Sequence, residues 1–153
     1  MANYWDGSAW KPLTLAEEAG KKRDISIGRS ISHPFDPMAG YSNVFMFKGP
    51  SAAVTLGQNP RFCFPTSAGN INTKVEYFIG VLRVKKNDRE IEKFIRDSRT
   101  GGGNLMFPQD KTLTTDVKRL SDRFVEVTPK RPLSEGQYVI GTNAMLMFDF
   151  GVR

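Results

Sequence analysis

Short apolar runs separated by turn-forming residues make up the chain from position 43 to its end. The runs occupy 44–47, 51–56, 61–64, 73–86, 89–97, 104–107, 123–129, 137–142 and 144–152. Gly, Pro, Asn and Asp lie between them, and these residues favour turns and interrupt both helices and sheet ladders. The pattern predicts seven or more short β-strands, as in a β-sandwich or barrel.

The longest run, TKVEYFIGVLRVKK at 73–86, leads through Asn87 and Asp88 into REIEKFIRD at 89–97. Two turn-forming residues between strand-like runs are typical of a tight β-hairpin. We therefore expect an antiparallel hairpin whose turn is formed by Asn87 and Asp88.

Residues 1–42 have a different pattern. They contain two tryptophans, a helix-compatible stretch at 13–20 (LTLAEEAG), a basic cluster at 21–23 and the turn-forming HPFDPMAG at 33–40. We interpret 1–42 as a partly ordered N-terminal arm and 43–153 as a β-sandwich domain. A chain of 153 residues suits one domain of average size and can bury a core without disulfides.

The segment PLSEGQYVIG at 132–141 places a polar turn before an apolar strand. A tyrosine that opens such a strand holds a crossing between two sheets when its hydroxyl bonds the backbone a few residues upstream. We expect this role for Tyr138, with Leu133 on the core side of the turn and Gly136 in backbone angles that other residues avoid. The alternative is an ordinary hairpin turn in which Tyr138 only packs.

Leu133, Gly136 and Tyr138 form a Leu-x-x-Gly-x-Tyr pattern after a proline, which resembles the tyrosine corner of fibronectin type III and bacterial immunoglobulin-like modules. Those modules often have proline before the glycine, where this chain has Glu135. The ending FDFGV is also similar to that of uncharacterised bacterial sandwich domains. The resemblance covers about the last thirty residues and carries no catalytic residue. It implies an all-β, immunoglobulin-like antiparallel β-sandwich from a bacterial or phage protein assembly.

The chain carries 22 Lys and Arg against 16 Asp and Glu, a formal net charge of +6. Such a balance permits contact with nucleic acid, anionic lipid or an acidic protein without selecting one. Basic side chains are concentrated on the predicted hairpin and form a candidate anion or nucleic-acid patch. They are Arg83, Lys85, Lys86, Arg89, Lys93 and Arg96. Glu90, Glu92 and Asp97 dilute this charge, and lysines at a strand edge also prevent aggregation.

The chain has one histidine, His33, in the segment SISHPFDP. Ser30, Ser32 and Asp36 supply the other residue types of a hydrolase triad, but triad members usually come from distant parts of a chain. No G-x-S-x-G motif is present. We therefore expect no enzymatic activity from this cluster.

Metal and cofactor sites are not predicted either. One histidine and the single Cys63 are too few ligands for zinc, and no dense acidic loop for calcium occurs. The triple glycine at 101–103 lacks the Lys-Ser/Thr of a phosphate loop. Cys63 lies between two phenylalanines and is expected to be a small buried residue.

Trp5 and Trp10 lie in the polar setting NYWDGSAW and are candidate partner-binding anchors. Alternatively, they cover an end of the sandwich, or Asp6 and Gly7 form a small hairpin between them. We expect a non-enzymatic interaction or structural module that binds a protein partner or itself. The alternatives are nucleic-acid binding by the basic hairpin and carbohydrate binding by the tryptophans. No apolar run has the length of a membrane span and no secretory signal is seen, so we expect a cytoplasmic location.

Overall fold

The structure of the chain, a computed structural model, describes residues 1–25, 41–66, 77–96, 104–106, 111–142 and 146–153. These residues form fourteen β-strands in two sheets, and none of them lies in a helix. Neighbouring strands within the described part are antiparallel except for β14 and β5, which are parallel. The prediction of an all-β fold with packed sheets is confirmed.

The smaller sheet has five strands in the order β11, β12, β6, β1, β2. They are β1 (Asn3–Trp5), β2 (Trp10–Pro12), β6 (Phe62–Pro65), β11 (Thr115–Arg119) and β12 (Phe124–Pro129). Strands β1 and β2, like β11 and β12, pair as neighbours in the chain, whereas β6 pairs with β1 and with β12 through long-range contacts.

The larger sheet has nine strands, with the order β3, β4, β8, β7, β13, β14, β5 and with β9 beside β8 and β10 beside β7. They are β3 (Glu18–Ile25), β4 (Tyr41–Lys48), β5 (Thr55–Leu56), β7 (Tyr77–Lys85), β8 (Asp88–Arg96), β9 (Asn104–Met106), β10 (Thr112–Leu113), β13 (Gly136–Thr142) and β14 (Met147–Val152). Strand β7 pairs with β8 on one side and with β13 on the other, and so joins β3, β4 and β8 to β13, β14 and β5.

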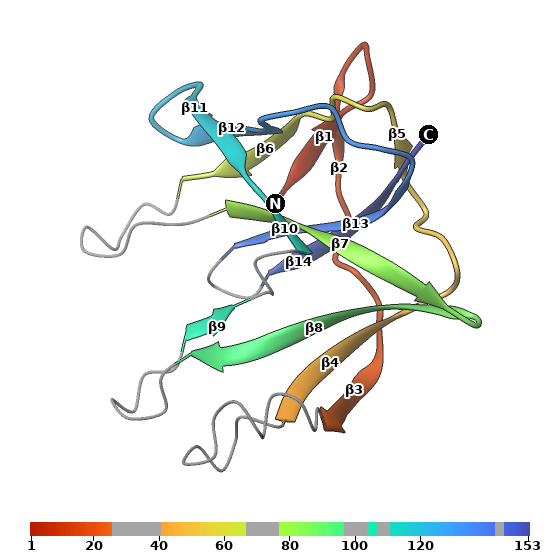
Figure 1. Ribbon diagram of the computed structural model, residues 1–153. Coiled ribbons are helices and arrows are strands. Elements are labelled where there is room, and N and C mark those ends of the chain that lie inside the picture. The colour runs from red at the N-terminus through yellow and green to blue at the C-terminus, as the bar shows by residue number, and fades with distance from the viewer. Residues whose placement is uncertain (26–40, 67–76, 97–103, 107–110, 143–145) are drawn as a thin grey trace.

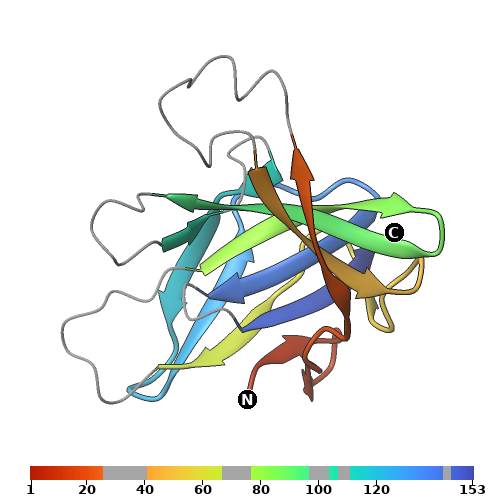
Figure 2. The same cartoon turned by 90° about the horizontal axis from the view of Figure 1, so that it is seen from below.

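The sheets form three tiers because the larger sheet folds over on itself (Figure 1). The five-stranded sheet is the upper tier, β7, β13 and β14 are the middle tier, and β3, β4 and β8 are the lower tier. Seen from below, β3 and β4 cross the middle strands at a steep angle, whereas β8 makes a smaller angle with β7 (Figure 2). The middle tier therefore has an apolar core on each of its faces.

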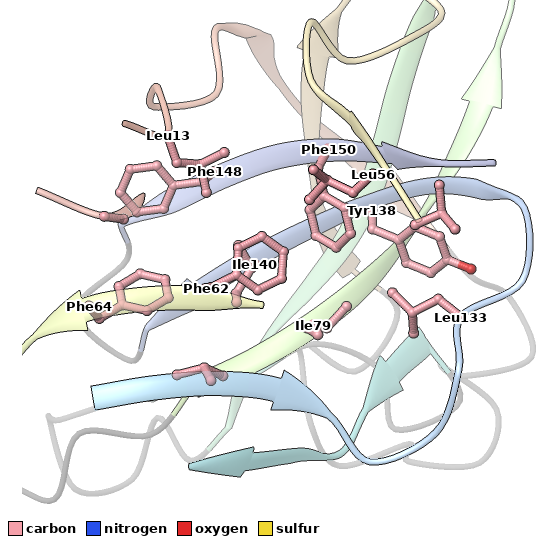
Figure 3. Packing of buried hydrophobic residues seen from close by; sticks show 13 residues of the cluster. Leu13, Leu56, Phe62, Phe64, Ile79, Leu133, Tyr138, Ile140, Phe148 and Phe150 are labelled. Carbon is pink, nitrogen blue, oxygen red and sulfur yellow. The ribbon is translucent and has the colours of Figure 1, made fainter. Parts of the chain in front are cut away.

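The first core lies between the upper and middle tiers (Figure 3). Phe62 and Phe64 are two residues apart on β6 and so share one face of the strand. Their rings meet those of Phe150 and Phe148 on β14, with centroids 4.9 and 5.9 Å apart respectively. Tilted and edge-on aromatic contacts at such distances add to the stabilisation from burial.

The second core lies between the middle and lower tiers. Its buried members are Phe45, Phe47, Leu82, Ile91, Val139 and Met147. The segment before β3 closes this half of the fold, because the Ala16 amide donates a hydrogen bond of 2.9 Å to the Met147 carbonyl on β14.

Gly80 on β7 permits the fold-over. A Cβ at this position would lie 2.6 Å from Cδ1 of Ile91 and 3.1 Å from Cγ1 of Val139. The first distance is shorter than real Cβ contacts and the second is tight, so the side chain of Ile91 on β8 fills the space above Gly80. Strand β8 pairs with β7 only at its start, and β10 pairs with β7 opposite Gly80.

Residues 1–42 were expected to form an arm outside the sandwich, but within them residues 1–25 supply β1 and β2 to the upper tier and β3 to the lower tier. The stretch 13–20, compatible with a helix by its composition, is not helical, since β3 begins at Glu18 and runs along β4 with an irregularity in register between Glu18 and Gly20. Pairing with β4 outweighs the weak local helix propensity of this stretch.

The hairpin expected at 73–97 is present within the described residues 77–96, but its turn lies one residue earlier than predicted. Lys86 and Asn87 form the turn, and Lys86 has a φ of 56°, as the first position of a tight hairpin requires. Asp88 pairs with Lys85, and its carboxylate accepts a hydrogen bond of 3.2 Å from the Gly49 amide. This contact fixes Asp88 in the strand rather than in the turn.

Candidate binding surfaces

Tyr138 lies at the start of β13, after the chain has crossed from β12 in the smaller sheet to the larger sheet. Its hydroxyl donates a hydrogen bond of 2.8 Å to the Ser134 carbonyl, four residues upstream, and its ring stacks on Phe150 with centroids 5.6 Å apart. Burial raises the pKa of Tyr138 above its ordinary value. Leu133 is buried in the same core, as Figure 3 shows.

Gly136 does not adopt the backbone angles that were expected of it. Its φ is not among the positive values of the described residues, which belong to Lys86, Gly7 and Gly49. A Cβ at Gly136 would instead lie 3.4 Å from the ring of Tyr138. That distance is an ordinary van der Waals contact, so the tyrosine ring packs closely on this position without requiring glycine there.

Arg89, predicted to belong to a surface patch for anions, points into the protein. Its side chain is 3% exposed and forms an ion pair with Asp149, with Nη1 2.6 Å from Oδ2. Its remaining donors reach the carbonyls of Gly49 at 2.9 Å and Lys48 at 2.7 Å. These contacts bind the guanidinium inside the fold, so it is not available to an external phosphate.

The other basic residues of the hairpin are distributed differently. Arg83 forms an ion pair with Glu90, which is buried, and the ammonium of Lys85 lies 3.9 Å from the same carboxylate. Lys86 is exposed at the turn. The backbones of Lys93 and Arg96 lie in β8, but their side chains are outside the described part. Glu90 therefore offsets charge at the centre of the expected patch.

Trp5 and Trp10 face each other across the β1–β2 hairpin, the arrangement weighed as an alternative from the sequence. They are directly paired in register, and their half-buried rings meet edge to face with centroids 5.4 Å apart. Asp6 fixes the loop, because its Oδ1 accepts hydrogen bonds from the amides of Ser8 and Ala9, both at 2.8 Å. These bonds hold the pKa of the Asp6 carboxyl well below its usual range.

Arg61 joins the two tryptophans to the rest of the sheet. Its guanidinium carbon lies 5.3 Å from the centroid of Trp5 and 5.5 Å from that of Trp10. Glu126 on β12 accepts hydrogen bonds from its Nε at 2.9 Å and its Nη2 at 2.5 Å. A cation held over indole rings by a carboxylate is attracted to the ring faces. The two rings and the guanidinium thus form a rigid cluster rather than a flexible pair of anchors.

Arg61 and Glu126 were not singled out from the sequence. They lie 65 residues apart, and neither belongs to a motif. Only the register of β1, β6 and β12 brings the guanidinium, the carboxylate and the indoles together.

The cluster belongs to one face of the five-stranded sheet, which we call the outer face. Directly opposite residues on neighbouring strands share a face, and alternate residues along a strand do so too. By register and alternation, the side chains on this face, opposite the core, include Trp10, Trp5, Arg61, Cys63, Glu126, Lys118, Phe124, Leu120, Pro65, Asp116, Thr128 and Lys130. Leu120 and Phe124 on this face are 44% and 40% exposed.

The sequence cluster Ser30, Ser32, His33 and Asp36 lies outside the described residues. Cys63 is buried, as expected, and burial together with the Glu126 carboxylate raises the pKa of its thiol. Within the described ranges, no three His, Cys, Asp or Glu side chains gather as metal ligands. The same ranges contain no helix that is long and apolar enough to cross a membrane.

Comparison of the chain with models of known protein families, with curated proteins and with solved structures finds no match.

Proposed function

We propose that this chain is a non-enzymatic interaction module, a structural subunit that binds another protein through the outer face. The observation that carries the proposal is the cluster of Trp5, Trp10 and Arg61, which is held rigid and yet half exposed on a sheet surface. Tryptophan and arginine dominate the binding energy of many protein interfaces. A preformed cluster also loses little conformational entropy on binding.

We further propose that the framework is an immunoglobulin-like sandwich with an added lower tier. In immunoglobulin domains, strands A, B, E and D form one sheet, strands C, F and G form the other, and the corner tyrosine stands near the start of F. If β13 is F, then β12 is E, and the neighbour orders β1-β6-β12-β11 and β7-β13-β14 follow the same scheme. The hydrogen bond from Tyr138 to Ser134 supports this assignment. Strands β3, β4 and β8 are then an extension beside strand C.

The test is affinity capture with the immobilised chain and two matched variants. Deletion of residues 1–25 is unsuitable because it would remove β1, β2 and β3. Trp10→Ala removes one ring from an edge strand, and Val84→Ala removes an exposed apolar side chain from β7 as the control. We expect Trp10→Ala to weaken capture of a specific protein by at least about tenfold, with the control unchanged.

Equal capture by all three proteins would overturn the proposal. The two alternatives drawn from the sequence have their own outcomes in the same experiment. Capture that is abolished by nuclease and by salt would point to nucleic-acid binding. Capture that is competed away by free glycans would point to carbohydrate binding by the indoles.

A further inference from the structure

Strand β11 (Thr115–Arg119) forms one edge of the five-stranded sheet. It pairs with β12 on one side, and no strand of the described residues pairs with its other side. Residues 116–119 are exposed, and Val117 at the centre of the strand is 50% exposed. An open edge of this kind is a template on which a further strand can add by backbone hydrogen bonds.

The register with β12 shows which backbone groups of β11 point away from the sheet. In an antiparallel pair, opposite residues alternate between those that exchange hydrogen bonds and those that do not. The Lys130 amide donates a hydrogen bond of 3.1 Å to the Thr114 carbonyl. The Leu120 amide likewise donates one of 3.0 Å to the Phe124 carbonyl. Even-numbered positions of β11 therefore bond to β12, so the N–H and C=O groups of Val117 point outward.

The side chains of β11 make this edge complementary to a second copy of itself. Asp116, Val117 and Lys118 are consecutive, so an antiparallel second copy centred on Val117 sets each aspartate directly opposite a lysine. Directly opposite residues on neighbouring strands share a face, and opposite charges there stabilise the pair. Val117 is also in register with the buried Val127 on β12. The two central valines thus continue a row of core residues across the edge.

Other antiparallel alignments of two copies lose this match. A shift of the centre by one residue sets Asp116 against its own copy or Lys118 against its own copy, and a shift by two sets Arg119 against its own copy. Like charges directly opposite each other are destabilising. A shift by two in the other direction centres the contact on Thr115, whose Oγ1 donates a hydrogen bond of 3.1 Å to the Tyr77 carbonyl on β7. That alignment has neither ion pair.

The same charges select against most unrelated strands. Lysine on an exposed edge is a feature that discourages indiscriminate strand pairing. A strand that suits this edge carries an acid opposite Lys118, a base opposite Asp116 and an apolar residue between them. Strand β11 itself, placed antiparallel, meets all three conditions.

Neighbouring charges on the outer face are compatible with this pairing. Glu126 lies opposite Lys118 on β12, so the row that continues to Asp116 of the second copy alternates in sign. The ammonium of Lys130 lies 3.9 Å from Oδ1 of Asp116, and both side chains are more than half exposed. Exposed pairs of this kind are weak, so Asp116 can accept a second cation.

We propose that the chain forms a homodimer in which β11 pairs with β11 of a second copy about a two-fold axis at Val117. The contact is the same on both copies, as closed two-fold symmetry requires. It joins the two five-stranded sheets into one and leaves both outer faces on the same side, open to the partner of the proposed function. Because the paired edges are short, we expect a dissociation constant on the order of 10 to 100 µM.

Charge exchange between two variants tests the pairing by sedimentation equilibrium of the intact chain. Asp116→Lys sets lysines opposite each other, and Lys118→Asp sets aspartates opposite each other. Each variant alone should have a dissociation constant at least about tenfold above that of the natural chain. An equimolar mixture should recover the dimer, because every cation then faces an acid. If either variant fails to fold, the chain that carries both substitutions restores both pairs and should dimerise like the natural chain.

Overall repulsion between cationic chains predicts a different result. Lys118→Asp lowers the formal net charge of +6 by two, which favours association through any other surface. Pairing of β11 predicts weaker association for this variant. Lys86→Asp, at the exposed turn of the β7–β8 hairpin, makes the same change of charge away from β11 and should not weaken the dimer.

Amide hydrogen exchange gives an independent measurement at the edge itself. The Val117 amide points outward in one copy and is hydrogen-bonded in the dimer, so its exchange should slow as the protein concentration rises. The amides of Asp116 and Lys118, which bond to β12, should be protected at every concentration.

Three results would overturn the homodimer. They are a monomer at all concentrations up to about 1 mM, a mixture of the two charge variants that does not associate, and a dimer in which exchange of the Val117 amide is independent of concentration. The proposed function is tested separately, because Trp10→Ala leaves β11 unchanged.

Discussion

Arg89 on β8 donates a hydrogen bond to Asp149 on β14, with Nη1 2.6 Å from Oδ2, although β7 and β13 lie between these strands in the sheet order. The contact is possible because the sheet folds over, so that the lower tier meets the middle tier. The buried guanidinium also donates hydrogen bonds to the carbonyls of Lys48 and Gly49. It therefore links the end of β4 and the segment after it to both the lower and the middle tier.

Arg89→Met should lower the free energy of unfolding by about 3 kcal/mol, because it leaves the Asp149 carboxylate and two carbonyls without their donor. Chemical denaturation measures this free energy of unfolding. Arg119→Met, which breaks the exposed pair with Asp122, should change it by less than about 0.5 kcal/mol. If the double variant Arg89→Met with Asp149→Leu is no more stable than Arg89→Met alone, the buried carboxylate is not the cause.

Gly80→Ala should destabilise the fold by about 1 to 3 kcal/mol, because the new methyl group would press on Ile91 and Val139 in the second core. Ile91→Val removes the nearest atom, so adding it to Gly80→Ala should recover part of the loss. Gly57→Ala is the control, because a Cβ there has no atom of the described chain within 4 Å. Thermal unfolding of the four variants gives the comparison.

Tyr138→Phe should cost about 1 kcal/mol of stability, since it removes the hydrogen bond to the Ser134 carbonyl and keeps the ring. Tyr4→Phe removes a hydroxyl from a ring that packs on the same core and serves as the control. Equal losses in the two variants would mean that the corner hydrogen bond contributes nothing of its own to holding the crossing.

Stability should fall as the pH rises above the ordinary tyrosine pKa of 10.0, because burial raises the pKa of both Tyr138 and Tyr77 in the folded state. Above pH 10.0 the unfolded chain loses these protons more readily than the folded chain, which favours unfolding. Below that pH both states are protonated and the effect vanishes. Denaturation midpoints between neutral and alkaline pH should decline less steeply in Tyr138→Phe than in the natural chain.

The β1–β2 hairpin should loosen in acid. Hydrogen bonds from the Ala9 and Ser8 amides lower the pKa of Asp6, so their stabilisation is complete above the ordinary value of 3.8 and is lost as the pH falls below it. Tryptophan fluorescence reports this directly, because Trp5 and Trp10 flank the loop. Asp6→Asn keeps an acceptor oxygen without titrating, so its fluorescence should not change over this range.

Local patterns in the sequence predicted the all-β class, most strands from position 43 onward and the role of Tyr138. These features depend on neighbours within a few residues, as the bond from Tyr138 to Ser134 does. The turn at Lys86 and Asn87 was misplaced by one residue because a contact from Asp88 to Gly49, 39 residues away, selects the register.

The sequence identified only some residues of the candidate site. Its tryptophans stand out by composition, whereas Arg61 and Glu126 are ordinary charged residues until β6 pairs with β1 and β12. Charge counting likewise placed Arg89 on the surface, because a sequence shows that a residue is cationic but not which side of a folded sheet it faces.

The sequence by itself determined where strands form and where the chain turns, because backbone preferences and side-chain alternation act over a few residues. Tertiary structure decided that residues 1–25 join both sheets and that the larger sheet folds over at Gly80. It also decided that the side chain of Arg89 is buried while that of Arg61 is partly exposed at the surface. These outcomes depend on pairing between distant strands, whose free energy comes from surfaces that do not exist until the chain has folded.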